Sequence, residues 1–160
     1  MHAAKQSERL EGVEQNTRSG TGTGCWNETT SKKLNDPNWN NFNTDTTEAR
    51  MILSDGVFLD TQLYYPACDN HRTNNTELPI YNVCGDFYLD TDGYKGENTL
   101  AKDIFPFWIT KQGQIVPCGT PEDTSHPISE CAMNQTGYGC TAWVIYKENM
   151  DYLKGKTVAW

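Results

Sequence analysis

The sequence predicts a small α+β domain, with a helical segment at the start of the chain followed by short antiparallel strands and long polar loops. Residues 2–15 are rich in helix-forming side chains, whereas later apolar runs are short, aromatic or β-branched, and bounded by Gly, Asp and Pro. Only 36% of the 160 residues are hydrophobic, below the roughly 45–50% of average globular chains. One domain with a modest core is therefore expected over residues 1–160.

The N-terminal helix is expected to end near Asn16, and Ala3, Leu10 and Val13 fall on roughly one of its faces. A helix this short is marginal alone in water. It must therefore pack on the rest of the protein or continue a longer helix upstream, and a frayed helix is the alternative. Residues 17–47 are polar and rich in Asn and Thr, which predicts a variable loop region with a cross-link or a function of its own.

Short strands are expected within residues 48–153. Two apolar runs around the turn Ser54-Asp55-Gly56 predict a β-hairpin over residues 50–64. Later in the chain, the apolar patterns predict strands at 115–118 and 141–146, a helical turn at 147–153 and a loose tail at 154–160.

The stretch from Cys84 to Thr110 holds the densest apolar residues of the chain. Its apolar runs, at 87–89 and 104–109, flank a turn rich in Asp and Gly, and this pattern predicts strand, loop and strand. Proline has no N–H to donate to a neighbouring strand. Pro106 therefore predicts that its strand lies at the edge of the sheet or begins late.

The charge of the chain argues against two classes of partner. The formal net charge is −8, and the densest basic cluster is the pair Lys32-Lys33. Binding to nucleic acid or to an anionic membrane surface needs clustered basic residues, so neither partner is expected. No apolar run is long enough to span a bilayer.

Six cysteines are scattered singly, without a C-x-x-C pair or the cysteine–histidine spacing of a zinc site. This favours disulfides formed outside the cytoplasm. Because no signal peptide is visible, we expect a mature or truncated form. Although six cysteines allow fifteen pairings, three bonds are predicted: Cys68–Cys84 and Cys131–Cys140 as local pairs, and Cys25–Cys118 as a link from the loop region to the sheet.

No motif in the sequence predicts an enzyme. There is no G-x-S-x-G, and His71 and His126 lie in polar loops, where a surface position is expected. Paired catalytic carboxylates would come from distant parts of the chain and have no signature in the spacing. No catalytic residues are therefore assigned.

The turn Asp90-Thr91-Asp92-Gly93 resembles the start of a calcium-binding loop, in which alternating carboxylates supply oxygen ligands and glycine permits a sharp bend. Asp103 could add an oxygen, so the candidate calcium site consists of Asp90, Asp92 and Asp103. The spacing departs from that of an EF-hand. The alternative is a turn in which the aspartates accept hydrogen bonds from backbone N–H groups.

Aromatic residues suggest a second kind of function, the recognition of a glycan or a protein. The candidates for such a surface are Trp26, Trp39, Tyr64, Tyr65 and Tyr138. A place in the core is the more common role of such residues, especially in a chain with so few aliphatic side chains.

Two stretches resemble bacterial type IV pilin-like proteins, the prepilin-type or type II secretion pseudopilin family. Residues 86–98, DFYLDTDGYKGEN, and the later Asp103-Ile104-Phe105 are similar to a pattern D-x-[DN]-G-x-K-G-P-N followed by D-x-F. Residues 139–152 resemble the C-terminal end of such proteins, and the likeness covers about residues 48–153. Glu97 stands where the family usually has proline, which leaves the rigidity of this loop open.

The resemblance implies a pilin-like fold, in which an N-terminal helix packs on a small antiparallel sheet with a disulfide-tied variable region. It implies a major or minor subunit of a type IV pilus or type II secretion-like filament, made as an inner-membrane precursor and displayed at the cell surface. Residues 1–16 would be the remnant of a longer apolar helix, whose missing part would contact other pilin subunits. The isolated head is then expected to be a monomer. A secreted or tip-located adhesin-like domain that binds a glycan or protein is the alternative.

Overall fold

An antiparallel sheet organises the part of the chain that the structure describes. The structure is a computed structural model, and it describes residues 50–52, 58–60, 65–91 and 99–160. The five strands follow one another in the sheet in the order β1-β2-β3-β4-β5, so each pairs with its neighbours in the sequence. They are β1 (Arg50–Ile52), β2 (Phe58–Asp60), β3 (Val83–Asp90), β4 (Ile104–Thr110) and β5 (Ile115–Pro117).

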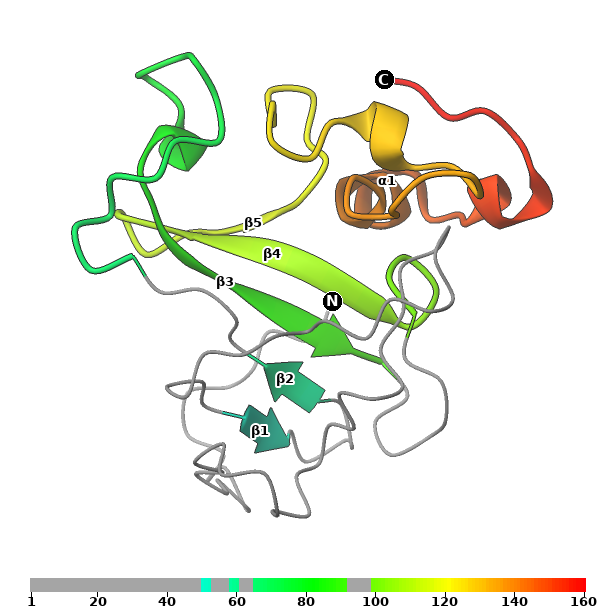
Figure 1. Cartoon of the computed structure of the whole chain (residues 1–160), viewed down its shortest axis with the longest axis horizontal. Coiled ribbons are helices and arrows are strands. Elements are labelled where there is room, and N and C mark those ends of the chain that lie inside the picture. Colours follow the sequence, from blue (N-terminus) through cyan, green and yellow to red (C-terminus); the bar gives the residue numbers. More distant parts are fainter. Residues whose placement is uncertain (1–49, 53–57, 61–64, 92–98) are drawn as a thin grey trace.

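Helices accompany the sheet, so the fold is mixed α+β, as the sequence predicts. The described helices are the 3-10 helices η2 (Pro79–Tyr81), η3 (Ile128–Glu130) and η4 (Asp151–Lys154), and the α-helix α1 (Cys140–Lys147). Figure 1 shows α1 and the C-terminal segment on one side of the sheet. None of these helices is long and apolar enough to cross a membrane. The helix expected at residues 2–15 and the loop region expected at 17–47 lie outside the described residues.

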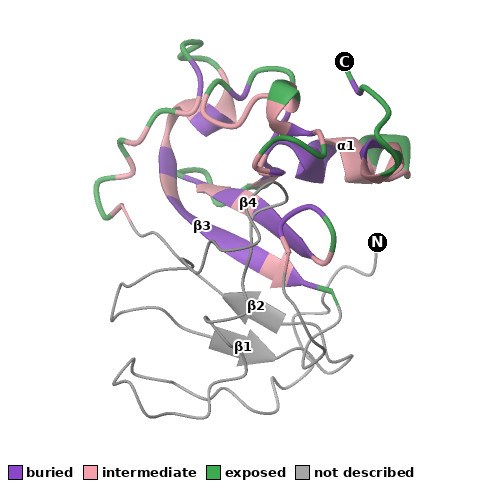
Figure 2. Cartoon of the chain, turned by 45° about the vertical axis from the view of Figure 1, so that its right-hand side comes forward, coloured by how far each residue is buried: buried purple, intermediate pink, exposed green. Residues whose placement is uncertain are grey.

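The paired strands β3 and β4 divide the sheet into two unlike faces. Phe87 lies opposite Phe107, and Asp86 lies opposite Trp108. Because successive side chains of a strand point to opposite faces, one face, here called the phenylalanine face, carries Phe87, Leu89, Phe105 and Phe107. The other, here called the C-terminal face, carries Asp86, Tyr88, Asp90, Ile104, Pro106 and Trp108. Figure 2 shows that β3 and β4 are buried along most of their length.

The C-terminal face is covered by the segment that follows β5, here called the C-terminal layer (residues 119–160). Trp108 stacks on His126, with ring centroids 5.3 Å apart, and Tyr88 meets Tyr138 edge to face at 6.4 Å. Two apolar clusters of described residues belong to this side: Ile80, Val83, Trp108 and Cys118 in one, and Ala101, Cys131, Cys140, Tyr152 and Val158 in the other.

The phenylalanine face forms a separate apolar layer. Phe87 and Phe107 stack across the two strands, with ring centroids 4.9 Å apart and planes inclined by 6°. Phe87 and Phe105 are only 9% and 8% exposed. Neither apolar cluster formed by the described residues includes a side chain of this face.

Pro106 lies inside a central strand, so the prediction that its strand lies at the edge or begins late is wrong. β4 begins at Ile104 and pairs with β3 on one side and with β5 on the other. Strand β4 tolerates the missing N–H donor of Pro106 because β5 ends near this residue. The carbonyl of Pro106 accepts from the N–H of Cys118 at 3.1 Å, and the carbonyl of Cys118 accepts from the N–H of Ala142 at 2.9 Å.

Residues 141–146 belong to helix α1, so the prediction of a strand there is wrong. A short apolar run is compatible with a buried helix as well as with a strand, and the tertiary contacts decide between them. α1 buries its first turn, and the N–H of Ala142, which has no acceptor within the helix, donates to Cys118. The helical turn expected at 147–153 is divided between the last residue of α1 and η4.

Residues 154–160 pack on the protein, so the prediction of a loose tail is also wrong. Val158 is 9% exposed and belongs to one of the apolar clusters. The indole N–H of Trp160 donates to the carbonyl of Gly119 at 3.0 Å. The end of the described chain is therefore part of the C-terminal layer.

Two glycines allow backbone segments of this layer to touch. A Cβ atom on Gly119 would overlap the carbonyl group of Gly139, and a Cβ atom on Gly139 would overlap the carbonyl group of Pro127. Gly119 also has a φ of +87°, which glycine adopts more readily than other residues. The close approach brings the end of β5, the start of α1 and the loop before η3 together.

Candidate functional site

The first candidate site is the end of the β3–β4 hairpin, where the sequence predicts calcium binding. Asp90 ends β3 with 0% exposure, and its strand partner is Ile104, so Asp103 lies beside it across the hairpin. The N–H and the hydroxyl of Thr91 both donate to the carbonyl of Asp103, at 2.9 and 3.1 Å. The structure thus places two of the three predicted ligands, Asp90 and Asp103, at the same end of the hairpin.

The carboxylate of Asp103 takes part in a turn. Its Oδ1 accepts a hydrogen bond from the N–H of Thr99, which is the contact that a turn-capping aspartate makes. Across the residues that the structure describes, no group of three His, Cys, Asp or Glu side chains could hold a metal ion. Asp92 lies outside those residues, so calcium binding at this turn stays a prediction.

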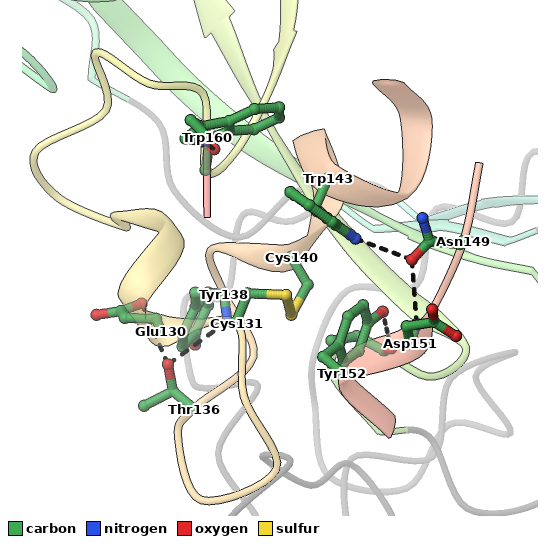
Figure 3. Close-up of a disulfide and its surroundings, with 12 residues drawn as sticks. Glu130, Cys131, Thr136, Tyr138, Cys140, Trp143, Asn149, Asp151, Tyr152 and Trp160 are labelled. Atoms are coloured by element: carbon green, nitrogen blue, oxygen red, sulfur yellow. Dashed lines mark hydrogen bonds between the residues drawn. A yellow bond between two sulfur atoms is a disulfide. The ribbon is translucent and has the colours of Figure 1, made fainter. Parts of the chain in front are cut away.

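Two disulfides tie the covering loops to the rest of the protein. They join Cys68 to Cys84 and Cys131 to Cys140, the two pairs expected as local. The first fixes the loop before η2 to strand β3, and the second fixes the end of η3 to the first residue of α1. Figure 3 shows the second bond between the η3 segment and the start of the helix that carries Trp143. Disulfides are compatible with an extracellular protein.

Cys118 is buried and forms no disulfide with another of the described cysteines. Burial raises the pKa of its thiol well above the usual value, and the nearby carboxylates of Asp123 and Asp86 raise it further. Its predicted partner Cys25 lies outside the described residues. The bond Cys25–Cys118 therefore stays a prediction.

The second candidate site is a polar network beneath the C-terminal layer, centred on Asp123, which is 2% exposed. One carboxylate oxygen accepts from the indole N–H of Trp108 at 2.8 Å and from the N–H of Gly119 at 3.2 Å. The other oxygen accepts from the N–H groups of Ser125 and His126, both at 3.0 Å. Four donors satisfy this buried carboxylate, which fixes the loop after β5 on the sheet.

Arg72 joins a second loop to the same tryptophan. Its guanidinium carbon lies 4.1 Å from the ring centroid of Trp108, and one nitrogen donates to the hydroxyl of Tyr65 at 3.0 Å. The carbonyl of Arg72 accepts from the N–H of Thr124 at 2.8 Å. The loop that contains the first disulfide and the loop that contains Asp123 are therefore bound to each other.

His126 is half-buried, so the prediction of a surface position is wrong for this residue, whereas His71 is exposed. The ring of His126 stacks on Trp108 and on Tyr138, with planes inclined by 11° and 15°. Its Nδ1 lies 3.1 Å from a carboxylate oxygen of Glu130. Sequence reasoning had no signal for this position, because the aromatic partners come from a distant strand and a later loop.

Two tyrosines, Tyr88 and Tyr138, also belong to the polar network beneath the C-terminal layer. Burial raises the pKa of Tyr138 to about 12 and raises that of Tyr88 well above its usual value. Both hydroxyls are therefore neutral over the physiological range. The contacts made by this network hold the C-terminal layer on the sheet. Tyr138, expected from the sequence as a candidate recognition residue, is part of this network.

The third candidate is an aromatic surface cluster that sequence reasoning missed, formed by Trp143, Tyr146, Lys147 and Trp160. Tyr146 and Trp160 are 58% and 40% exposed. The ring of Trp160 lies 5.7 Å from that of Trp143 and 6.0 Å from that of Tyr146. The ammonium of Lys147 lies 5.7 Å from both indole rings. The helical spacing of residues 143, 146 and 147 is the sequence signal for this cluster, and the strand expected at 141–146 does not bring these side chains to one side.

The aromatic residues expected to form a recognition surface do not gather there in the described residues. Tyr65 and Tyr138 are partly buried and contact Arg72 and His126. Trp26, Trp39 and Tyr64 lie outside the described residues.

No family model, no curated protein and no solved structure matches this chain.

Proposed function

We propose that this chain is the head domain of a bacterial type IV pilin-like subunit, a structural part of a pilus or type II secretion-like filament without catalysis of its own. The motifs at residues 86–98 and 139–152 support this proposal. The observation that carries it is the two-faced antiparallel sheet. One face is occupied by the C-terminal layer, and the other carries stacked aromatic rings of low exposure that belong to a separate apolar layer.

The phenylalanine face suits the N-terminal helix that the pilin fold requires. Phe87 and Phe105 have low exposure but belong to neither cluster of described residues. Burial of an aromatic side chain contributes roughly 1.5–3 kcal/mol, so a cover for this face stabilises the head substantially. We assign that cover to residues 2–15, whose apolar side chains Leu10 and Val13 fall on one helical face.

Charge placed on the expected helix tests this assignment. Leu10→Asp should lower the free energy of unfolding by about 2–4 kcal/mol, because it puts a carboxylate against the phenylalanine face. Gln15→Asp adds the same charge on another side of the helix and should change stability little. Urea unfolding measures the stability of both variants. Equal stability of the two would contradict the packing of this helix on the phenylalanine face.

Localisation of the full-length gene product tests the role in a filament. A pilin-like subunit should reside in the inner membrane before assembly and appear in surface filaments afterwards, since about 20 apolar residues upstream of the head suffice to span a bilayer. Recovery of the full-length product free in the medium, in cells that make no filaments, would contradict this role.

The aromatic surface cluster favours a second candidate, an adhesin-like binding domain at a filament tip or in secreted form. Exposed tryptophan and tyrosine rings are common at recognition surfaces. A glycan or protein ligand that loses affinity on Tyr146→Ala, in a product that never enters filaments, would favour this alternative.

A further inference from the structure

We propose that the aromatic surface cluster binds a second copy of this chain, through the loop surface that carries Asp69 and Glu77. The inference rests on the proposed function, because it names the contact by which neighbouring heads of one filament touch. It is carried by the geometry of the cluster, by its charge, and by the position of the acidic loop.

The two indole rings of the cluster are preorganised, because their N–H groups already donate to acceptors within the molecule. The indole N–H of Trp143 donates to the amide oxygen of Asn149 at 3.1 Å, and that of Trp160 donates to the carbonyl of Gly119 at 3.0 Å. Figure 3 shows Trp143 directed at Asn149, with Trp160 near it. Both rings are thus held in place before binding, which lowers the entropic cost of ordering them in a contact.

The charge of the cluster selects an acidic partner. Lys154 and Lys156 both pair with Asp151, whereas Lys147 forms no ion pair with any other described residue. Residues 140–160 contain three lysines and two acidic residues, so this segment has a net charge of +1 in a chain whose total is −8. The remaining residues therefore carry −9, and another copy of the chain supplies the complementary surface.

The acidic loop before β3 is suited to meet the cluster. Asp69 and Glu77 are exposed, while the loop's arginine, Arg72, is turned inward onto Trp108. The bond Cys68–Cys84 and the hydrogen bond from Thr124 to the carbonyl of Arg72 hold the loop. A fixed loop with outward acidic side chains presents a stable surface to a cationic, aromatic partner.

The two surfaces lie apart on one molecule, so the contact is head to tail. In both Figure 1 and Figure 2 the loop of residues 65–82 lies to the left, whereas α1 and the C-terminal residues lie to the right. Different patches on the two partners make a heterologous interface, which repeats along a chain of copies instead of closing a pair. This geometry fits an open-ended array of heads.

The contact is weak between free heads. Exposed charge pairs stabilise an interface only weakly, and a small interface of this type corresponds to a Kd on the order of 0.1–1 mM. The isolated head is then a monomer at ordinary concentrations. In a filament, subunits held by other contacts have effective concentrations in the millimolar range, so the same contact becomes occupied.

Sedimentation of the 160-residue chain at rising concentration tests the proposal. In low salt, the wild-type chain should form dimers and longer species near 1 mM. The patch variant Tyr146→Ala/Lys147→Ala and the loop variant Asp69→Lys/Glu77→Lys should each lower the association constant at least tenfold. Lys102→Ala and Glu122→Lys change exposed charges at other positions and should leave association unchanged. Matching circular dichroism spectra establish that all variants are folded.

A mixture of the two variants gives the decisive result. The patch variant keeps an intact loop and the loop variant keeps an intact patch, so the mixture should recover association but stop at one-to-one dimers. A wild-type chain that stays monomeric at 1 mM in low salt overturns the proposal, as does a mixture that fails to associate. A ligand such as a glycan that binds the patch without any association of copies also overturns it. These results do not depend on the test of membrane location and filament assembly described above. Either proposal can therefore be overturned while the other stands.

Discussion

The two faces of the sheet are covered by different kinds of interaction. On the C-terminal face, the carboxylate of Asp123 binds four donors and Trp108 meets both Arg72 and His126. On the phenylalanine face, the described contacts are stacked rings. Directional hydrogen bonds to a buried group must each be satisfied, whereas apolar packing accepts residues of similar volume. The C-terminal face should therefore be far more sensitive to single substitutions.

The largest effect is expected at Gly119. Gly119→Ala should lower the free energy of unfolding by about 4 kcal/mol or more, because the added methyl group overlaps the backbone of Gly139 at a positive φ. Gly113→Ala is the matched control: its φ is +75°, but nothing lies within 4 Å of the added atom, so it should cost only about 1–2 kcal/mol. Urea unfolding measures both, and equal losses would show that the close approach can relax.

Asp123→Asn should have the next largest effect, a loss of about 2–4 kcal/mol. The amide keeps the size of the side chain but places a donor against the N–H groups of Trp108 and Gly119, or against those of Ser125 and His126. Thermal unfolding of this variant should be compared with that of Glu122→Gln, the same kind of change at an exposed residue of the same loop. A similar melting temperature for both would mean that the network is not the main tie of the C-terminal layer.

Alkaline pH should loosen the C-terminal face. In the unfolded chain tyrosines ionise near pH 10, whereas burial raises the pKa of Tyr138 to about 12. The folded state therefore keeps a proton that the unfolded state loses, so stability is complete below about pH 10 and falls as the pH rises towards 12. Urea midpoints at pH 8, 10.5 and 11.5 measure the loss. Tyr138→Phe should reduce it, and Tyr146→Phe, on the surface, should not.

Neighbouring residues of β4 compare the two faces directly. Trp108→Phe removes the N–H that binds Asp123 and should cost about 2 kcal/mol. Phe107→Leu keeps an apolar side chain and should cost less, about 1 kcal/mol. Chemical unfolding of the two variants, in the same buffer, gives the difference. A reversed order would mean that stacking on the phenylalanine face outweighs the hydrogen-bond network.

The smallest effect is expected from calcium at the hairpin end. If Asp90, Asp92 and Asp103 bind the ion, calcium at ten times its Kd should stabilise the fold by about 1.4 kcal/mol. The melting temperature should then rise between chelator and millimolar calcium, and Asp92→Asn should abolish the rise. An unchanged midpoint assigns the aspartates to turn capping alone.

The strands could be predicted from the sequence because their signals are local. The sequence Ser54-Asp55-Gly56 and the Asp- and Gly-rich stretch after β3 separate apolar runs that do form strands. The pairs Cys68–Cys84 and Cys131–Cys140 also follow from short separations along the chain. These features depend on residues that are close in sequence.

The errors share a cause, which is contact between distant residues. α1 replaced the expected strand because its first turn is buried and its N–H at Ala142 finds an acceptor on Cys118. The tail is ordered because Trp160 reaches Gly119, and His126 is half-buried because Trp108 and Tyr138 enclose its ring. The aromatic surface cluster likewise unites α1 with the end of the chain. None of these partners can be read from periodicity or composition.

The strand order of the sheet has a consequence for folding kinetics. Each strand pairs with the next one along the chain, so the sheet closes through local hairpins. The C-terminal layer instead depends on pairs such as Arg72 with Thr124 and Ala101 with Tyr152, which are 52 and 51 residues apart. Closing such long loops costs entropy before their contacts are gained. The sheet should therefore form first and the layer dock last, so the layer sets the lifetime of the folded protein more than the speed of its formation.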